Sequence, residues 1–191
     1  EVIDLGILAD SAQGMVKALE EAAAVADMVM TSGGVSVGQA DWIKPALAET
    51  GELGFWRIAM RPGKPLIFGR IAGTPMMGMP GNPVSSLVCG LVYLRPAIRA
   101  MLGLNPRATR QTAILGCDLA ANDQRQDYLR AKASTNGNGE WVATPFDKQD
   151  SSMLFRLTQA HCLILRAPHA EPAHAGDRVE IIPLDGETTG I

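Results

Sequence analysis

The chain has 191 residues, a length that suits one large domain or two small ones. Hydrophobic residues make up 47% of it and charged residues 19%, so a folded protein with a substantial core is expected and a disordered chain is excluded. The net charge of −3 and the lack of any lysine- or arginine-rich run exclude a sequence-general nucleic-acid binder, which needs a basic surface.

The first elements are a strand over residues 2–8, a helix, and a short apolar strand over residues 27–31. Asp10 or Ser11 can cap the helix. Its apolar side chains recur at helical spacing, at Met15, Val16, Leu19, Ala23 and Ala26. The chain starts at Glu1, inside the first strand, without methionine or the zones of a signal peptide, so we expect a fragment of a longer protein.

A second helix is predicted over residues 42–49, and Gly51 ends it. Strands are predicted over residues 55–60 and 66–71, on the two sides of a proline-rich turn. Residues 76–79 form a further short apolar strand. Strands and helices thus alternate along this part of the chain.

A long apolar helix is predicted over residues 84–102, with Pro83 in its first turn and a kink at Pro96. The alternation up to this point predicts an α/β fold, a mixed and mostly parallel sheet with flanking helices. Ligands of such sheets bind beyond the carboxyl ends of the strands. The loops that start at Ser32 and Pro80 fit this rule, because each leaves an apolar strand and enters a helix.

The pattern changes after residues 103–106, a turn-rich linker. Short strand-like segments now alternate with turns, and no helix longer than about two turns is evident. The expected strands cover residues 112–117, 128–133, 140–143, 162–166 and 178–182. We therefore expect two domains, an α/β domain at residues 1–104 and a small β-barrel-like domain at residues 105–191.

Cys89, Cys117 and Cys162 lie far apart and form no CxxC pair, so they predict neither a disulfide framework nor a cysteine-ligated zinc site. The longest apolar run, residues 87–94, is shorter than the roughly 18 to 20 residues that cross a bilayer. We expect a soluble, cytoplasmic protein. The three histidines lie in the second half without a Ser/His/Asp or Cys/His signature, so nucleophilic catalysis is not indicated.

The strongest local signal is the loop at residues 31–41, TSGGVSVGQAD. Its glycines permit positive φ and expose backbone N–H groups, and its serines add hydroxyl donors, which together suit a phosphate or another oxyanion. The residues in question are Ser32, Gly33, Gly34, Ser36 and Gly38. The loop is neither a Walker A motif nor a GxGxxG fingerprint, and a glycine-rich turn without a ligand stays an alternative.

Asp41 ends this loop next to the predicted helix. Its carboxylate can cap the helix, or it can hold Mg²⁺ beside a bound phosphate, since that cation prefers carboxylate and phosphate oxygens. A second loop, RPGKP at residues 61–65, presents Arg61 and Lys64 on a backbone stiffened by two prolines, which favours contact with an oxyanion over two solvated charges.

Three loops together are more specific than any one of them. TSGGVSVGQAD, RPGKPLIFG and GMPGNPVSS, in this order and at this separation, resemble the MoeA family of molybdopterin molybdenumtransferases, whose eukaryotic relatives include the E domain of gephyrin. The resemblance is close over residues 1–104, where it implies a fold like that of the MoaB and Mog proteins. Beyond them it rests on DYLRA at 127–131, QDSSML at 149–154 and AGDRVE at 175–180.

The resemblance implies an enzyme of molybdenum cofactor biosynthesis. Members of the family hydrolyse the phosphoanhydride of adenylylated molybdopterin with Mg²⁺, insert molybdate at the dithiolene sulfurs and release AMP. That chemistry needs a phosphate pocket, a divalent cation and a site for a tetrahedral oxyanion, without a protein nucleophile. A homodimer, contact with other molybdenum cofactor assembly proteins, and no nucleic-acid or membrane partner are implied as well.

The resemblance also implies roles for single residues. Asp41, Lys64 and Arg61 would be catalytic, with Asp41 as the metal ligand and the two cations towards molybdate. The substrate-binding residues would be Ser32, Gly33, Gly34, Ser36, Gly38, Pro65, Gly81, Asn82, Ser85, Arg130 and Ser151. Among these, Arg130 and Ser151 would face molybdate, while Asn82 and Ser85 would support the pterin pocket or, for Ser85, cap the helix.

Two residues depart from the family's pattern. Gln39 stands where many relatives carry an acid, and Arg61 stands where a lysine is common, which keeps the charge and changes its geometry. The family's N-terminal domains and an earlier βα unit with further active-site acids have no counterpart in this chain, so we expect it to be inactive alone.

Two other functions stay open. The chain can be a non-catalytic molybdopterin-binding or scaffold module, although a pure scaffold has no need for Asp41, Arg61 and Lys64. It can instead be a molybdopterin adenylyltransferase, which shares the α/β domain but lacks the β domain. The sequence does not distinguish molybdate from tungstate, because both are tetrahedral oxyanions of similar charge.

Overall fold

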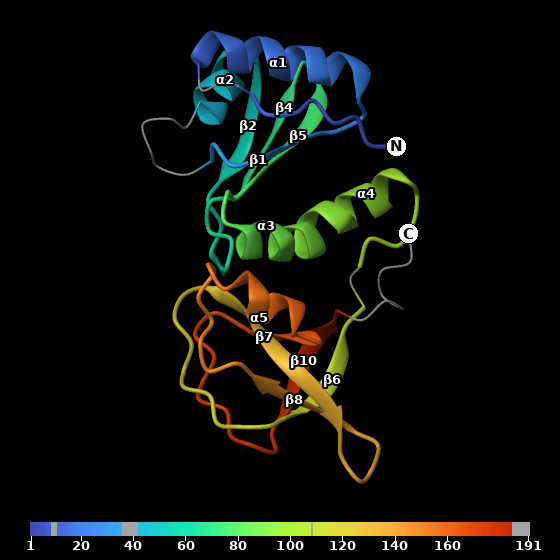
Figure 1. The fold of residues 1–191 in the computed structure, drawn as a ribbon, viewed down its shortest axis with the longest axis vertical. Helices are drawn as coiled ribbons and strands as arrows, with labels where there is room; N and C mark the ends of the chain where they lie inside the picture. Colours follow the sequence, from blue (N-terminus) through green and yellow to red (C-terminus); the bar gives the residue numbers. More distant parts are fainter. Residues whose placement is uncertain (9–10, 36–41, 108, 185–191) are drawn as a thin grey trace. The chain divides into compact units, whose positions relative to one another are not determined.

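The computed structural model describes residues 1–8, 11–35, 42–107 and 109–184 (Figure 1). The chain divides into two compact units. The first unit comprises Glu1–Ile58 and Gly63–Gly90, and the second comprises Ala59–Pro62 and Leu91–Ile191. A four-residue segment from the first half of the sequence therefore belongs to the second unit.

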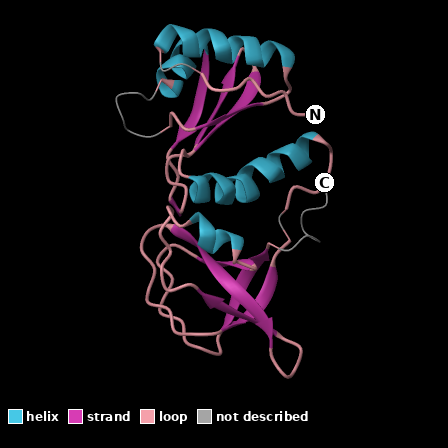
Figure 2. Cartoon of the chain, viewed as in Figure 1, coloured by secondary structure: helices cyan, strands magenta, loops and turns pink. Residues whose placement is uncertain are grey.

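The first unit contains a four-stranded mixed sheet (Figure 2). Its strands, in spatial order, are β1 (Val29–Ser32), β5 (Thr74–Met79), β4 (Ile67–Ile71) and β2 (Gly51–Trp56). The pair β1–β5 is parallel, and β5–β4 and β4–β2 are antiparallel. The expected α/β class with a mixed sheet is confirmed, with a smaller parallel share than expected.

A tight hairpin explains the antiparallel share. Ala72 and Gly73 connect β4 to β5 with φ values of 47° and 87°. Two successive residues at positive φ form the kind of two-residue turn whose twist matches that of the flanking strands. Alanine does not favour positive φ, so only Gly73 marks this turn in the sequence.

Three helices accompany the sheet. α1 (Ala12–Val25) starts at Ser11, whose hydroxyl accepts a hydrogen bond from the Gly14 N–H, so the predicted cap is confirmed. α2 (Ile43–Thr50) ends at Gly51, as predicted. α3 (Pro83–Cys89) starts after Asn82 with proline in its first turn.

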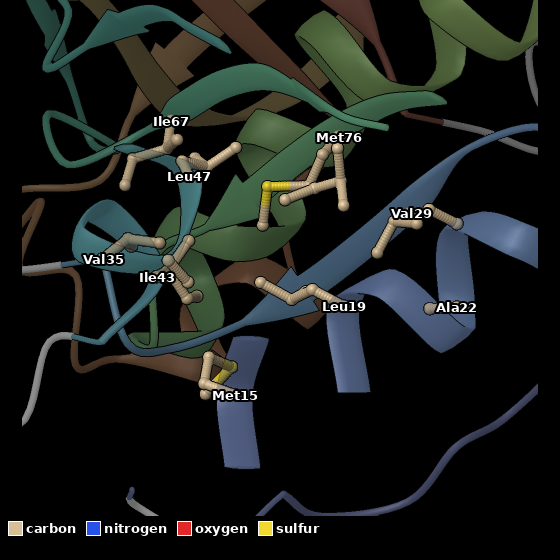
Figure 3. Close-up of a cluster of buried hydrophobic side chains, with 12 residues drawn as sticks. Met15, Leu19, Ala22, Val29, Val35, Ile43, Leu47, Ile67 and Met76 are labelled. Carbon is tan, nitrogen blue, oxygen red and sulfur yellow. The ribbon is translucent and has the colours of Figure 1, made fainter. Parts of the chain in front are cut away.

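The core of the first unit forms where α1 and α2 pack against β1, β4 and β5 (Figure 3). Side chains spaced three and four residues apart along the helices point into it, as the periodicity predicts. The core side chains include Leu19, Ile43, Leu47, Ile67 and Met76, all with an exposed fraction of 1% or less.

The predicted strand over residues 2–8 is wrong. The segment is irregular, and its apolar side chains are exposed except that of Leu8, which packs against the core; Ile7 is fully exposed. A strand needs a neighbour for its N–H and C=O groups, and no described residue pairs with this segment. Residues 2–8 instead line a cavity of about 640 Å³ together with α1 and β1, the strand at the edge of the sheet.

The strand predicted over residues 55–60 is shifted. β2 begins directly after α2 and ends at Trp56, because Arg57 has a φ of 68° that interrupts the extended backbone. Met60–Arg61 then forms the two-residue strand β3, which belongs to the second unit.

The second unit is a small β-barrel. Its strands are β6 (Gln111–Leu115), β7 (Gln126–Thr135), β8 (Trp141–Pro145), β9 (Cys162–Arg166) and β10 (Arg178–Pro183). They follow the order β7-β8-β6-β10-β9, and β9 pairs back with β7. Closure leaves these five strands without a free edge, which confirms the expected barrel-like domain.

The long helix is interrupted. α3 is followed by the π-helical turn η1 (Gly90–Leu94) and by α4 (Arg95–Met101). Pro96 has no N–H to donate to the carbonyl of Val92, so the irregular turn falls immediately before it, where the kink was predicted. Only one further helix, α5 (Leu154–Thr158), occurs among the described residues of the second unit beyond α4.

The combined stretch Pro83–Met101 has 19 residues and a mean hydropathy of 1.3 in its most apolar window. By length and composition it could cross a membrane, so the expectation that no segment is long enough is corrected. A core helix can have the same length and composition. Val84 and Val88 of α3 are fully buried.

Truncation of Leu47 tests the core of the first unit. Leu47→Ala removes a fully buried side chain of α2, and we expect it to lower the free energy of unfolding by about 2–5 kcal/mol. Val25→Ala on the exposed face of α1 is the matched control, with an expected change below about 0.5 kcal/mol. Denaturant unfolding measures both, and equal effects would contradict the assigned core.

Candidate functional site

The two loops expected to bind a ligand, which start at Ser32 and Pro80, follow strands that end side by side in the sheet. Ser32 at the end of β1 is in register with Met79 at the end of β5, and the two strands run parallel. The Gly33 N–H donates to the Met79 carbonyl over 3.0 Å, which extends the pairing by one residue. The carboxyl ends of both strands therefore open into adjacent loops, as the α/β rule predicts.

Gly33 and Gly81 allow these loops to touch through their backbones. A Cβ atom placed on Gly81 would lie 3.4 Å from the Gly33 Cα. Gly33 and Gly34 have φ values of 90° and 68°, a region that favours glycine. The Gly34 N–H makes no backbone hydrogen bond to a described residue and is thus the first free donor of the loop. The Gly33 N–H, in contrast, is already used within the sheet.

A side-chain hydrogen bond from Trp56 connects the end of β2 to the glycine-rich loop. The Trp56 indole N–H donates to the Val35 carbonyl over 3.4 Å. The Lys44 Nζ and the Arg57 Cζ each lie 4.0 Å from the centre of the Trp56 ring. Cations over an indole ring are held by its quadrupole. This cluster was not predicted from the sequence, where its sign is a tryptophan that follows one basic residue by 12 positions and precedes another directly.

Ser36, Gly38 and Asp41 lie in residues 36–41, outside the described residues. Gln39 lies there too. Among the described residues, no group of three or more histidine, cysteine, aspartate or glutamate side chains is arranged to hold a metal ion.

Asn82 and Ser85 have roles in the start of α3. The Asn82 Oδ1 accepts hydrogen bonds from the N–H groups of Val84 and Ser85, over 3.2 and 3.4 Å. The Ser85 side chain is buried within the unit. The helix cap occupies the side-chain oxygen of Asn82, so its amide N–H groups are the ones available to a ligand.

Lys64 is exposed, and its ammonium forms no ion pair with a described residue. Its backbone is fixed, because the Lys64 carbonyl accepts from the Ile58 N–H over 3.0 Å. Pro65 next to it is half-buried. Burial raises the pKa of the nearby Cys89 thiol to about 12, so Cys89 is a neutral thiol and no nucleophile at this loop.

Arg61 is not the free cation that the sequence suggests. Its Nε and Nη2 donate to the two carboxylate oxygens of Asp127 over 2.9 and 2.5 Å. Nη1 donates to Asp123 over 3.2 Å, and Nη2 also donates to Asn122 over 3.3 Å. The hydrogen bonds with Asp127 raise the pKa of Arg61. All these acceptors are 61 or more residues away in the sequence, so local spacing gives no sign of them.

Arg130 on β7 is a buried cation, exposed by 1%. Its Nε donates to the Gln149 Oε1 over 3.3 Å and its Nη1 to the Met153 carbonyl over 3.4 Å. The Nη2 group is buried and donates to no described residue. Desolvation lowers the pKa of Arg130, and the nearby Asp150 partly opposes that effect. Ser151, beside Asp150, is half-buried.

The sequence of the chain matches two family descriptions. Residues 1–100 match the family described as "Probable molybdopterin binding domain", and residues 112–184 match the MoeA C-terminal region, domain IV. The first match covers more than half of the chain. This chain belongs to the MoeA family.

The relatives of this MoeA-family chain include molybdopterin molybdenumtransferases. The one of Haemophilus influenzae is 35% identical over 187 residues, which cover 97% of this chain and 46% of that protein. Molybdopterin molybdenumtransferase 1 of Mycobacterium tuberculosis is 30% identical over 188 residues, with 95% and 44% covered. The chain thus spans about half the length of these curated relatives.

A solved structure agrees with the fold. The molybdopterin biosynthesis MoeA protein from Pyrococcus horikosii superimposes with a TM-score of 0.75 and 28% identity, covering 95% of this chain and 43% of the other. The predicted family and the α/β fold followed by a small barrel are confirmed. The chain is homologous to molybdenumtransferases of molybdenum cofactor biosynthesis.

The site residues expected from the MoeA resemblance divide between the two units. The first unit holds Ser32, Gly33, Gly34, Lys64, Pro65, Gly81, Asn82 and Ser85. The second unit holds Arg61, Arg130 and Ser151. Within the first unit the structure brings the Ser32 and Gly81 loops together. The role of each residue in binding or catalysis stays a prediction.

Arg61 forms a cluster with Asp123, Asp127 and Asn122. The stability of this cluster depends on pH through the Asp123 carboxylate. Hydrogen bonds from Arg125 lower the pKa of Asp123 to about 2, with a smaller contribution from Arg61. Its unfolded value is about 3.9, so the ionised carboxylate stabilises the fold fully above pH 4 and loses this effect as the pH falls through 2.

We therefore expect Asp123→Asn to lower the Tm at pH 5 to 7 and to have little effect at pH 2. The matched control is Asp147→Asn, because the Asp147 carboxylate makes no ion pair with a described residue. Thermal unfolding between pH 2 and 7 measures both variants. A Tm difference for Asp123→Asn that does not shrink towards pH 2 would contradict the prediction.

Proposed function

We propose that this chain forms the substrate-binding part of a molybdopterin molybdenumtransferase. It binds adenylylated molybdopterin and takes part in the insertion of molybdate, with Mg²⁺-dependent release of AMP. The observation that carries the proposal is the backbone approach of Gly33 and Gly81 at the carboxyl ends of β1 and β5. The parallel strand pair of an α/β sheet binds its ligand at this edge.

The phosphate groups of the substrate bind at the Ser32-Gly33-Gly34 loop in this proposal. The Gly34 N–H is free among the described contacts, and the hydroxyl of the exposed Ser32 lies next to it in the chain. Backbone N–H groups bind phosphate oxygens without a competing side chain. Ser36 and Gly38 continue the same loop, and the amide N–H groups of Asn82 and the Ser85 hydroxyl line the pterin side.

Mg²⁺ would be held by Asp41 together with phosphate oxygens of the substrate. One or two carboxylates and substrate phosphates are the usual ligands of this ion, and the described residues provide no larger acidic cluster. The ion, when bound, supplies charge neutralisation at the phosphoanhydride. The protein's own residues hold the phosphates and exclude other anions.

Each unit offers a cation for the oxyanion in this proposal, Lys64 in the first unit and Arg130, with Ser151, in the second. A buried guanidinium with an unused N–H group favours an anionic partner, because an unpaired buried donor is costly. The Lys64 ammonium is exposed and unpaired among the described residues, so it is free to contact molybdate. The neutral Cys89 thiol is consistent with a transfer that uses no protein nucleophile.

We also propose that residues 1–104 are the molybdopterin-binding domain and residues 105–191 the C-terminal domain of a cytoplasmic homodimer that meets other cofactor assembly proteins. Met101 and Leu102, exposed by 48% and 59%, support an apolar contact near the end of α4. A non-catalytic binding module is the second candidate, because residues 1–100 match a family described as a probable molybdopterin binding domain.

Widening the gap between the two loops tests the proposed function. In the full-length protein, Gly81→Val should reduce kcat/KM for AMP release at least tenfold, because its Cβ already reaches van der Waals contact with the Gly33 Cα and its two γ-methyl groups need further space between the loops. Gly137→Val is the control, since a Cβ at Gly137 meets nothing within 4 Å, and it should keep full activity.

The AMP-release assay also distinguishes a molybdenumtransferase from a non-catalytic binding module. Binding of AMP without its release would favour the non-catalytic module. Unchanged kcat/KM in folded Gly81→Val would contradict the proposed site.

A further inference from the structure

Asp127 is a buried carboxylate whose charge is neutralised by Arg61. The Asp127 side chain is exposed by 6%, and Arg61 contacts both of its oxygens in the forked geometry of guanidinium and carboxylate. Removal of one partner from a buried ion pair leaves an uncompensated charge and strongly destabilises a fold. The second unit therefore needs a cation at this point, and the guanidinium of Arg61 satisfies both oxygens of Asp127.

The other acceptors of Arg61 are fixed independently of it. Asp123 also binds Arg125, over 2.7 Å. The amide of Asn122 donates to the carbonyls of Arg125, Arg166 and Ala167, over 2.8 to 3.1 Å. The side-chain oxygens of Asp123 and Asn122 are therefore held in position by contacts other than those with Arg61. Four of its five N–H groups donate to Asp127, Asp123 and Asn122.

The backbone around Arg61 is held at the same place. β3 pairs in parallel with the start of β7, with Met60 opposite Gln126 and Arg61 opposite Asp127. The Gln126 N–H donates to the Ala59 carbonyl over 2.9 Å. Side chain and backbone therefore fasten the segment Ala59–Pro62 to β7 at one point, two residues before Lys64 in the chain.

We infer that Arg61 is a positioning residue: it fastens the segment Ala59–Pro62 to β7 through Asp127 and so fixes the backbone that leads to Lys64, to which the proposed function already assigns contact with the oxyanion. The assignment of Lys64 rests on the proposed function, whereas the anchor does not. Arg61 has one N–H group left for a ligand, while the Lys64 ammonium forms no ion pair with any described residue.

A double-mutant cycle on the full chain tests the anchor. Arg61→Gln and Asp127→Asn should each lower the Tm by about 5 °C, and the double variant should lower it by less than the sum of the two. Arg61→Lys should recover part of the loss, because an ammonium keeps the charge without the fork. Additive Tm losses would overturn the anchor.

Binding of inorganic molybdate to the full-length protein, measured by calorimetry, tests the second part. Lys64→Gln should weaken binding at least tenfold with an unchanged Tm. Arg61→Gln and Asp127→Asn should weaken it by similar factors, because both act through the same anchor, and Arg61→Lys should restore much of it.

The opposite pattern identifies Arg61 as a direct ligand of the anion. In that case Arg61→Gln abolishes molybdate binding, while Asp127→Asn leaves it unchanged or tightens it, and the inference falls. If Lys64→Gln binds molybdate as the wild type does, the Lys64 assignment and the proposed oxyanion site fall together. The anchor is then decided by the Tm cycle alone.

Discussion

The close approach of two backbones, at Gly33 and Gly81, is the constraint on which the candidate site depends. This approach is possible because β1 and β5 run parallel and end opposite each other. The loops that follow the two strands therefore start side by side. A Cβ at Gly81 would lie 3.4 Å from the Gly33 Cα, which is van der Waals contact. The sheet, its core and the cap of α3 hold these two points together, and the loop that follows can then present free N–H groups to an anion.

The second unit contains two buried charged side chains with different surroundings. It buries one carboxylate, Asp127, against a forked guanidinium, and it buries one guanidinium, Arg130, with an N–H group that donates to no described residue. The first arrangement is complete in the protein alone, and the second leaves one buried donor without a partner among the described residues. In the proposed function, the first arrangement serves as a rigid frame and the second as a cation for the oxyanion.

Local patterns predicted most elements of the fold. α1, α2 and the barrel strands follow from periodicity and from turn residues such as Gly51, because their burial is encoded within each segment. Residues 2–8 carry a strand pattern and form none, since a strand also needs a neighbour. The resemblance of three loops identified the family. The partners of Arg61 could not be read from spacing, because Asp123 and Asp127 lie more than 60 residues away.

The most direct test of the account is an amide NMR titration of the full-length protein with AMP, followed at the loops after β1 and β5. The account predicts that the Gly34 N–H shows a saturable shift among the largest in the spectrum, accompanied by Gly81, because a phosphate oxygen becomes its acceptor. Saturable binding of AMP that leaves the Gly34 and Gly81 resonances unmoved would contradict it.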